Sequence, residues 1–281
     1  GRSGSLPPLR ASRPMPPIPI KDAAGIAGMR ASCRMARKIL EELCTHLEPG
    51  KTTGEIDQKA GELIAKHGAR SAFLGYRKFP GQLCISVNEE VVHGIGGSRR
   101  LGYGDVVKLD VGIILDGWVG DTATTVGVGA ITPARQKLLE RTQAALSAGI
   151  AAARGGVKLG DVSHAVETTV KKAGYSVVRE FVGHGVGRKL HEEPQVPNYG
   201  KRGERQRLKA GMTLAIEPMV NMGSAKSRVL SDGWTAITQD RKPSAHYEHV
   251  VLITTGEPEV LTWRERMFPR GVDSLAAVAV G

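Results

Sequence analysis

Cysteines and aromatic residues are scarce in this chain of 281 residues, and it has no long apolar run. The three cysteines form no Cys-x-x-Cys pair, so reduced thiols in a cytoplasmic protein are expected rather than a disulfide framework. No apolar run approaches the roughly 18 residues that a membrane-spanning helix needs. The N-terminus lacks an apolar core of about 7–15 residues, which argues against a secretory signal. The composition therefore predicts a cytoplasmic protein that does not enter a membrane.

Hydrophobic residues make up 41% of the chain and charged residues 24%, as in ordinary folded proteins with a sizeable core. The net charge is +11, and the first 40 residues hold eight basic side chains against one acidic residue, Asp22. Such a patch attracts polyanions, including RNA. Since no aromatic residues alternate with the charges, a solvated basic surface explains the pattern equally well.

Residues 1–20 contain six prolines and no hydrophobic periodicity, which predicts a basic, proline-rich N-terminal arm. A single folded domain is expected over residues 21–263, followed by a C-terminal tail over residues 264–281.

Periodicity and capping residues predict four helices, over residues 26–47, 52–68, 132–155 and 161–174. The second starts with a capping box of Thr52 and Glu55, and the third has Pro133 in its first turn. Strand-like runs occupy residues 83–87, 106–115, 118–126, 212–216 and 248–253. Because two helices followed by strands occur twice, the predicted fold class is α+β, with two related halves around one sheet.

A hairpin is predicted where Asp116 and Gly117 stand between two apolar runs. That turn places Gly112 opposite Asp121, and Asp110 shares a face with Gly112 because side chains alternate along a strand. Asp110 and Asp121 are then diagonal neighbours. Two carboxylates this close repel each other unless a positive charge lies between them. Either aspartate alone would be better explained as a strand-end residue, but the pair predicts a cation site.

Three further segments carry acids or histidines in unusual places. Glu217 ends one apolar strand and Glu248 begins another, and a carboxylate there is costly unless it is paired or coordinated. His184 and His191 flank a glycine-rich turn, whose backbone permits close approach. This oxygen-rich set with imidazole suits a pair of manganese, iron, cobalt or zinc ions and not a thiolate-rich structural zinc site.

These strings, among them HEEPQV at 191–196 and EPM at 217–219, resemble those of type I methionine aminopeptidases. The resemblance spans residues 21–263 and implies the pita-bread fold, with two pseudo-symmetric halves of paired helices around a curved, mainly antiparallel sheet. It also implies two divalent metal ions, with the following ligands: Asp110, Asp121, His184, Glu217 and Glu248. Glu217 would in addition shuttle a proton.

By the same resemblance, His93 lies near the substrate amine and the scissile amide, and His191 stabilises the carbonyl oxygen. An apolar pocket would take the thioether side chain. Its implied lining is Tyr76, Phe79, Cys84, His93, His191 and Trp234, with Phe73, Leu190, Met219 and His246 nearby. Core packing also explains Tyr76 and Phe79 taken singly. Leu190, His246 and Val92 differ from the family's usual residues, so the resemblance does not determine the pocket shape, but it leaves the five ligands untouched.

Asn88 and Ser244 match positions near a monovalent-cation site of the family. The implied function is removal of N-terminal methionine from nascent proteins and peptides, with a small second residue, by metal-activated hydroxide. A monomer is the family's habit, and the basic arm suggests docking at the ribosome. Two alternatives stay open: a proline-specific peptidase of the same fold, and an inactive pita-bread protein that binds RNA or the ribosome.

Overall fold

The computed structural model describes residues 16–263. The rest of the predicted arm (residues 1–15) and the predicted tail (residues 264–281) lie outside this range. The helices are α1 (Ala23–Cys44), α2 (Thr53–Lys66), the short 3₁₀ helix η1 (Tyr76–Lys78), α3 (Pro133–Ala152) and α4 (Leu159–Lys172). Within the described residues, no helix combines the length and the apolar character needed to cross a membrane.

All strand pairs among the described residues are antiparallel. The strands are β1 (Arg70–Ser71), β2 (Cys84–Val87), β3 (Glu90–Val92), β4 (Val106–Leu115), β5 (Trp118–Gly127), β6 (Ser176–Val177), β7 (Gly183–Gly185), β8 (Glu192–Val196), β9 (Thr213–Ile216), β10 (Met219–Asn221), β11 (Ser227–Val229), β12 (Ala236–Thr238), β13 (Ser244–His246), β14 (His249–Leu252) and β15 (Glu259–Val260). In one sheet β4 pairs with β1, β2 and β5, and in another the order is β15-β14-β9-β7-β8. Three-stranded sheets β13-β10-β6 and β11-β12-β3 complete the arrangement.

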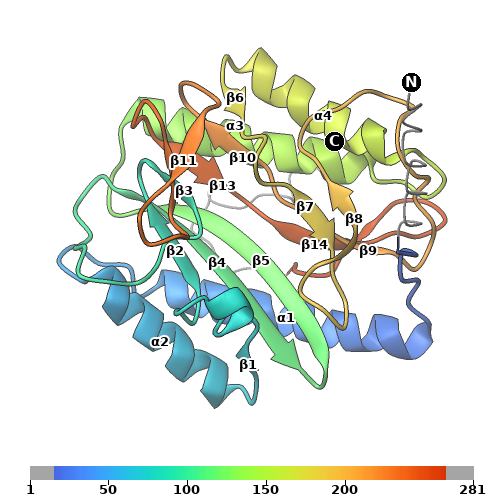
Figure 1. Ribbon diagram of the computed structural model, residues 1–281, viewed down its shortest axis with the longest axis horizontal. Coiled ribbons are helices and arrows are strands. Elements are labelled where there is room, and N and C mark those ends of the chain that lie inside the picture. Colours follow the sequence, from blue (N-terminus) through green and yellow to red (C-terminus); the bar gives the residue numbers. More distant parts are fainter. Residues whose placement is uncertain (1–15, 264–281) are drawn as a thin grey trace, which may run out of the picture.

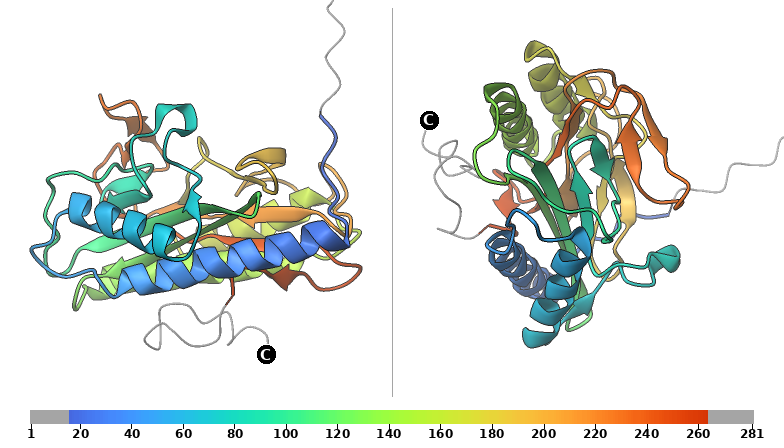
Figure 2. Two further views of the ribbon diagram at one scale, coloured as in Figure 1. Left: turned by 90° about the horizontal axis from the view of Figure 1, so that it is seen from below. Right: turned by 90° about the vertical axis from the view of Figure 1, so that its left-hand side faces the viewer.

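The two halves are built alike, each from two helices and a central antiparallel strand pair (Figure 1). Helices α1 and α2 pack on β2 and β4 around buried residues such as Leu40, Ile56 and Leu109. Helices α3 and α4 pack beside β9 and β14 around a second apolar cluster that includes Leu146 and Val166. Figure 2 shows α1 and α3 on the same side of the strands, which leaves the opposite side free for a binding site. The predicted α+β class with two related halves is confirmed.

The predicted hairpin register is also confirmed. In the structure Leu115 pairs with Trp118, and Gly112 pairs with Asp121. The turn residues Asp116 and Gly117 both have positive φ, 49° and 79°, as a two-residue hairpin with this twist requires. The halves meet where β5 forms a bridge to the start of β14, between Ala123 and Glu248.

The helix ends differ from the predicted ones by one to three residues. Helix α1 ends at Cys44 instead of residue 47, because the hydroxyl of Thr45 donates to the carbonyl oxygen of Glu42 (2.6 Å) and ends the last turn. Helix α3 ends at Ala152. Helix α4 begins two residues early, at Leu159, because carbonyl oxygens of the 204–206 loop accept its first N–H groups. That loop lies far away in the sequence, so local capping patterns could not reveal its effect.

Candidate metal centre and substrate cleft

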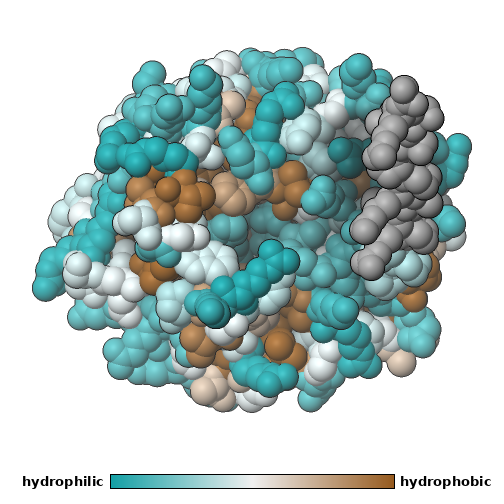
Figure 3. All heavy atoms as spheres, viewed as in Figure 1, coloured by the Kyte–Doolittle hydropathy of each residue, from teal (hydrophilic) through white to brown (hydrophobic). Residues whose placement is uncertain are grey.

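A cleft of about 800 Å³ opens between the two halves. Figure 3 shows the hollow near the middle of the face that it presents, with hydrophobic side chains gathered on either side of it. The structure brings all six predicted pocket residues to its walls: Tyr76, Phe79, Cys84, His93, His191 and Trp234. Phe73, Leu190 and Met219 also line it, whereas His246 is buried, with 1% of its surface exposed, and does not.

The five predicted metal ligands converge at the floor of this cleft, from both halves. Asp110 and Asp121 come from the β4–β5 hairpin, and His184 comes from β7. Glu217 directly follows β9, and Glu248 directly precedes β14. The Nε2 atom of His184 lies 3.4 Å from Asp121 Oδ2, 3.2 Å from Glu217 Oε1 and 3.9 Å from Glu248 Oε2.

Buried oxygen atoms without partners show that this cluster fits metal ions. One oxygen of Asp110, one of Asp121 and both of Glu248 are buried and have no hydrogen-bond partner within the described part of the chain. Buried polar atoms are nearly always satisfied, so these four oxygens indicate a missing positive partner. Two groups have candidate ligand atoms within 4.8 Å of one another, and they share Glu248: Asp110, Glu217, His246 and Glu248, and Asp121, His184 and Glu248. The geometry therefore suits neighbouring cations.

The buried carboxylates of the metal-free cluster lie close together, and this shifts their pKa values. Burial, together with the negative charge of Asp121, raises the pKa of both Asp110 and Glu248 well above the usual range. Burial would also raise the pKa of Glu217, but hydrogen bonds from His184 and His246 outweigh it and lower that pKa. Burial lowers the pKa of His184, but Asp121 and Glu217 raise it above the usual range. A divalent cation would replace these protons.

His191 stands at the rim of the cleft, with its orientation set by a tyrosine. The Tyr76 hydroxyl lies 2.8 Å from Nδ1 of His191, and the rings of His184 and His191 meet edge to face, with centroids 4.3 Å apart. Burial and the neighbouring His184 lower the pKa of His191 to about 4, so it is neutral near pH 7. If Tyr76 donates to Nδ1, the single ring proton is on Nε2, which leaves that atom as a hydrogen-bond donor.

His93 occupies a strained backbone position in the opposite wall. Its φ is +61°, in the left-handed region, where residues other than glycine are uncommon and cluster at functional sites. Gly94 follows it, and a Cβ atom there would collide with the carbonyl oxygen of Ile85. The rings of Phe181 and Trp234 contact His93 edge to face, at centroid distances of 5.0 and 6.3 Å. Packing on both sides therefore holds this imidazole in place.

The sequence patterns alone missed several residues of this site. Phe181 gave no signal, because it lies outside every recognisable motif. His246 was expected near the pocket. Instead it contacts the carboxylate cluster, with its Nε2 atom 3.0 Å from Glu217 Oε2. Lys108 was not expected at all, although its Nζ bonds to the carbonyl oxygens of Asn88 and Ser244, at 2.8 and 2.9 Å.

Comparison with known proteins agrees with this geometry. Residues 27–255 match metallopeptidase family M24, and the chain belongs to that family. Methionine aminopeptidase 1 of Bacillus subtilis is 49% identical over 234 residues, which cover 83% of this chain and 94% of that protein. The crystal structure of methionine aminopeptidase from Thermotoga maritima is similar with a TM-score of 0.86 and 42% identity, covering 88% of this chain and all of that one.

Prolidase from Pyrococcus furiosus has the same fold at a greater distance. Its TM-score is 0.72 at 24% identity, and the match covers 88% of this chain but 66% of that one. These comparisons confirm the predicted resemblance to methionine aminopeptidases, the pita-bread fold and a metal-dependent aminopeptidase activity.

Proposed function

We propose that this enzyme releases methionine from the N-terminus of peptides and nascent proteins, with a small residue in second place. The observation that carries the proposal is the cluster of four carboxylates and His184, with unpaired buried oxygens, at the floor of a cleft with apolar and aromatic walls. The names of the B. subtilis and T. maritima relatives support methionine as the residue released.

We assign the two divalent ions to the following side chains: Asp110, Asp121, His184, Glu217 and Glu248. Their oxygen-rich composition accepts manganese, iron, cobalt or zinc. When bound, such ions supply Lewis acidity, which polarises a carbonyl group and lowers the pKa of water toward neutrality.

The protein's own residues handle the proton and the substrate. Glu217 accepts a proton from the attacking water and passes it toward the leaving amine, a role that requires an ionised carboxylate, and Glu217 is ionised at neutral pH. The Nε2–H group of His191 donates to the substrate carbonyl oxygen and stabilises the charge that develops there. His93, held between Phe181 and Trp234, positions the amide nitrogen and the free α-amine.

The walls of the cleft account for the choice of side chain. Phe79 and Trp234 meet edge to face, with ring centroids 5.1 Å apart, and Cys84 lies buried beside them. Burial and Asp110 raise the pKa of Cys84 well above its usual range, so it remains a thiol and acts as an apolar wall. Sulfur and aromatic rings form the kind of lining that suits a thioether. Leu190 extends less far into the cleft than an aromatic side chain at that position would.

The direct test is hydrolysis of three peptides, Met-Ala-Ser, Met-Leu-Ser and Ala-Pro-Ser, by metal-stripped protein before and after addition of Mn(II), Fe(II), Co(II) or Zn(II). We expect metal-restored release of methionine from the first peptide, and little or none from the other two. Cleavage of the proline peptide would favour the prolidase branch instead. A folded protein that loads metal but cleaves none of the peptides would favour an inactive binding protein.

We further propose that the enzyme acts in the cytoplasm on chains leaving the ribosome, and that the basic arm helps it dock there. Pro16, Pro17 and Pro19, where the described part of the chain begins, line the mouth of the cleft, so the preceding basic residues are connected close to the substrate's entry. Deleting residues 1–15 should weaken co-sedimentation with ribosomes and leave peptide turnover unchanged. Unchanged co-sedimentation would remove the arm from the proposal.

A further inference from the structure

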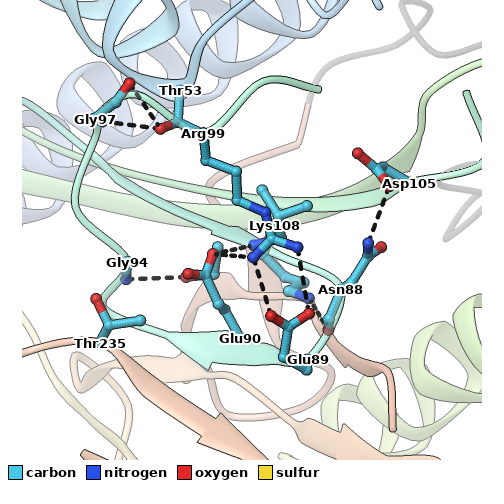
Figure 4. A network of polar contacts seen from close by, with 12 residues as sticks. Thr53, Asn88, Glu89, Glu90, Gly94, Gly97, Arg99, Asp105, Lys108 and Thr235 are labelled. Atoms are coloured by element: carbon cyan, nitrogen blue, oxygen red, sulfur yellow. Dashed lines mark hydrogen bonds and ion pairs between the residues drawn. The ribbon is translucent and has the colours of Figure 1, made fainter. Parts of the chain in front are cut away.

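Lys108 is a buried lysine on β4, in the same row of side chains as Asp110. Only 1% of its surface is exposed. Its Nζ atom donates to the carbonyl oxygen of Asn88 at 2.8 Å (Figure 4). It also donates to the carbonyl oxygen of Ser244, at 2.9 Å. Two main-chain oxygens from distant segments thus converge on one nitrogen atom. Two carbonyl oxygens that converge in this way can bind a cation, and here the Lys108 ammonium group occupies that position.

Charged groups of both signs surround this nitrogen. Three carboxylates and two guanidinium groups belong to the same polar network: Glu89, Glu90, Asp105, Arg99 and Arg135. Arg99 and Arg135 act against a positive charge at Lys108. Burial lowers the pKa of Lys108 to about 7, and Glu90 and Glu89 act in the opposite direction. The network thus offsets part of the cost of burying the ammonium.

The two carbonyl groups belong to segments that carry residues of the catalytic cleft. Asn88 is in the turn before β3, and that strand leads directly to His93. Ser244 begins β13, whose last residue, His246, contacts Glu217. These segments lie in different sheets, and β4 lies in a third. The N–H group of Ser244 also donates to the Asn88 carbonyl oxygen (3.1 Å), so the ammonium group adds to a contact between the turn before His93, the strand that carries His246 and the strand that supplies Asp110.

From this arrangement we infer that Lys108 is a built-in monovalent cation, which positions the His93 and His246 segments and makes the enzyme independent of potassium and sodium. The monovalent cation expected near Asn88 and Ser244 does not fit this chain, because a nitrogen atom already lies on both carbonyl oxygens. Lys108 is a positioning residue, since it contacts neither the carboxylate cluster's ligand atoms nor the substrate pocket.

The test compares two substitutions with the wild type, in tetramethylammonium, sodium, potassium and ammonium chlorides at equal ionic strength. Lys108→Ala leaves room for an ion between the two carbonyl groups, whereas Lys108→Met fills most of that room with an uncharged side chain. Lys172→Ala, at an exposed position on α4, controls for the general effect of losing a lysine. Each protein is assayed for its melting temperature and for kcat and KM.

We expect the wild type and Lys172→Ala to be indifferent to the choice of cation. In tetramethylammonium, both Lys108 variants should melt several degrees lower and lose about tenfold in kcat, with little change in KM, because the two buried carbonyl groups lose the ammonium donor. Potassium or ammonium should restore Lys108→Ala saturably and should not restore Lys108→Met. The rescue separates this role from one in which the lysine stem merely fills space.

A second readout does not depend on activity. Crystals of Lys108→Ala soaked in rubidium chloride should show an anomalous peak between the Asn88 and Ser244 carbonyl oxygens, and wild-type crystals should show none. The kinetic measurements rest on the proposed peptidase activity. The melting temperatures and the rubidium crystals remain valid tests if that activity is wrong. A wild type that needs potassium or sodium would overturn the inference, even if Lys108→Ala fails to fold. So would a Lys108→Ala variant that folds and that no monovalent cation restores.

Discussion

At the scale of single residues, the direction of hydrogen bonds decides what the histidines can do. His184 is oriented by a bond of 2.9 Å between its Nδ1 and the carbonyl oxygen of Gly185, which turns Nε2 toward the carboxylates. His191 is oriented by the hydroxyl of Tyr76. In both cases a partner at Nδ1 sets the role of the other ring nitrogen.

Tyr76→Phe tests this orientation of His191. Without the hydroxyl, the ring proton can move to Nδ1, and Nε2 ceases to be a donor for part of the time. We expect kcat to fall about tenfold with a small change in KM, because the lost bond acts mainly on the transition state. Tyr103→Phe is the matched control, since Tyr103 is 82% exposed. Equal activity of the two variants would show that Tyr76 does not orient His191.

Glu217→Gln tests the proton shuttle. The amide keeps the size of the side chain and cannot take a proton at neutral pH, so kcat should fall by about 10²–10⁴-fold. Because Glu217 is also a proposed metal ligand, metal content must be measured by atomic absorption on the same sample. A variant that retains both ions and keeps wild-type turnover would contradict the assignment.

Part of the metal centre could be predicted because an acid in an apolar strand requires an explanation, whereas the pocket and the roles of His93 and His191 followed from the family resemblance. Asp110, Asp121, Glu217 and Glu248 all stand out in this way, and the hairpin register placed the first two together. Lys108 is also a charged residue in an apolar strand, but its partners are main-chain oxygens, which leave no mark in a sequence. The position of Phe181 against His93 depends on the loop after β6 and is likewise invisible locally.

At the scale of secondary-structure elements, the loop that carries His93 depends on a close approach of two backbone segments. The N–H group of Gly94 donates to the hydroxyl of Ser86 (3.0 Å), and its carbonyl oxygen accepts from the N–H of Ile85 (3.0 Å). No side chain fits between this loop and β2.

Gly94→Ala should therefore displace the loop and destabilise the fold. We expect the melting temperature to fall by several degrees and kcat/KM to fall with it, since His93 is the preceding residue. Gly97→Ala is the control in the same loop, because the nearest atom to an added Cβ there is 3.9 Å away. Calorimetry of both variants measures the difference, and equal melting temperatures would refute the steric argument.

Elements of four or more residues were largely predictable, and most of the shorter ones were not. The ten-residue strands β4 and β5 and the four α-helices are long enough for apolar runs, periodicity or capping residues to mark them locally. Strands β3 and β10–β13 have three residues each, and their pairing is set by partners far away in the sequence, as for Val92 opposite Ala236. Such strands exist only in the folded context, so no window of sequence could identify them.

At the scale of the whole molecule, the metal-free cluster should weaken the fold as pH rises. Asp110 and Glu248 have raised pKa values in the folded protein, so above about pH 4 the folded state binds more protons than the unfolded chain. His184, with a raised pKa, acts in the same direction. The contribution of these three groups to the free energy of unfolding of the metal-free protein should then decrease from about pH 5 to 8, whereas bound metal should remove most of this decrease. Histidines with lowered pKa values, such as His191 and His249, act in the opposite direction with or without metal.

Thermal unfolding with EDTA or with Mn(II) across that pH range measures the effect. The gap between the two melting temperatures should widen toward high pH, and Asp110→Asn should flatten the metal-free curve. A gap that narrows as pH rises would show that these carboxylates are ionised without metal.

The division of the ligands between the two halves has a consequence for protein synthesis. Two of them come from the hairpin that ends at residue 127, but Glu248 is separated from that hairpin by the whole second half. A growing chain can therefore form the hairpin early and still lack a complete centre. A molecule of this enzyme that is still being translated cannot remove methionine from other chains, or from its own N-terminus, until residue 248 has emerged. Any methionine removed before then is removed by a molecule made earlier.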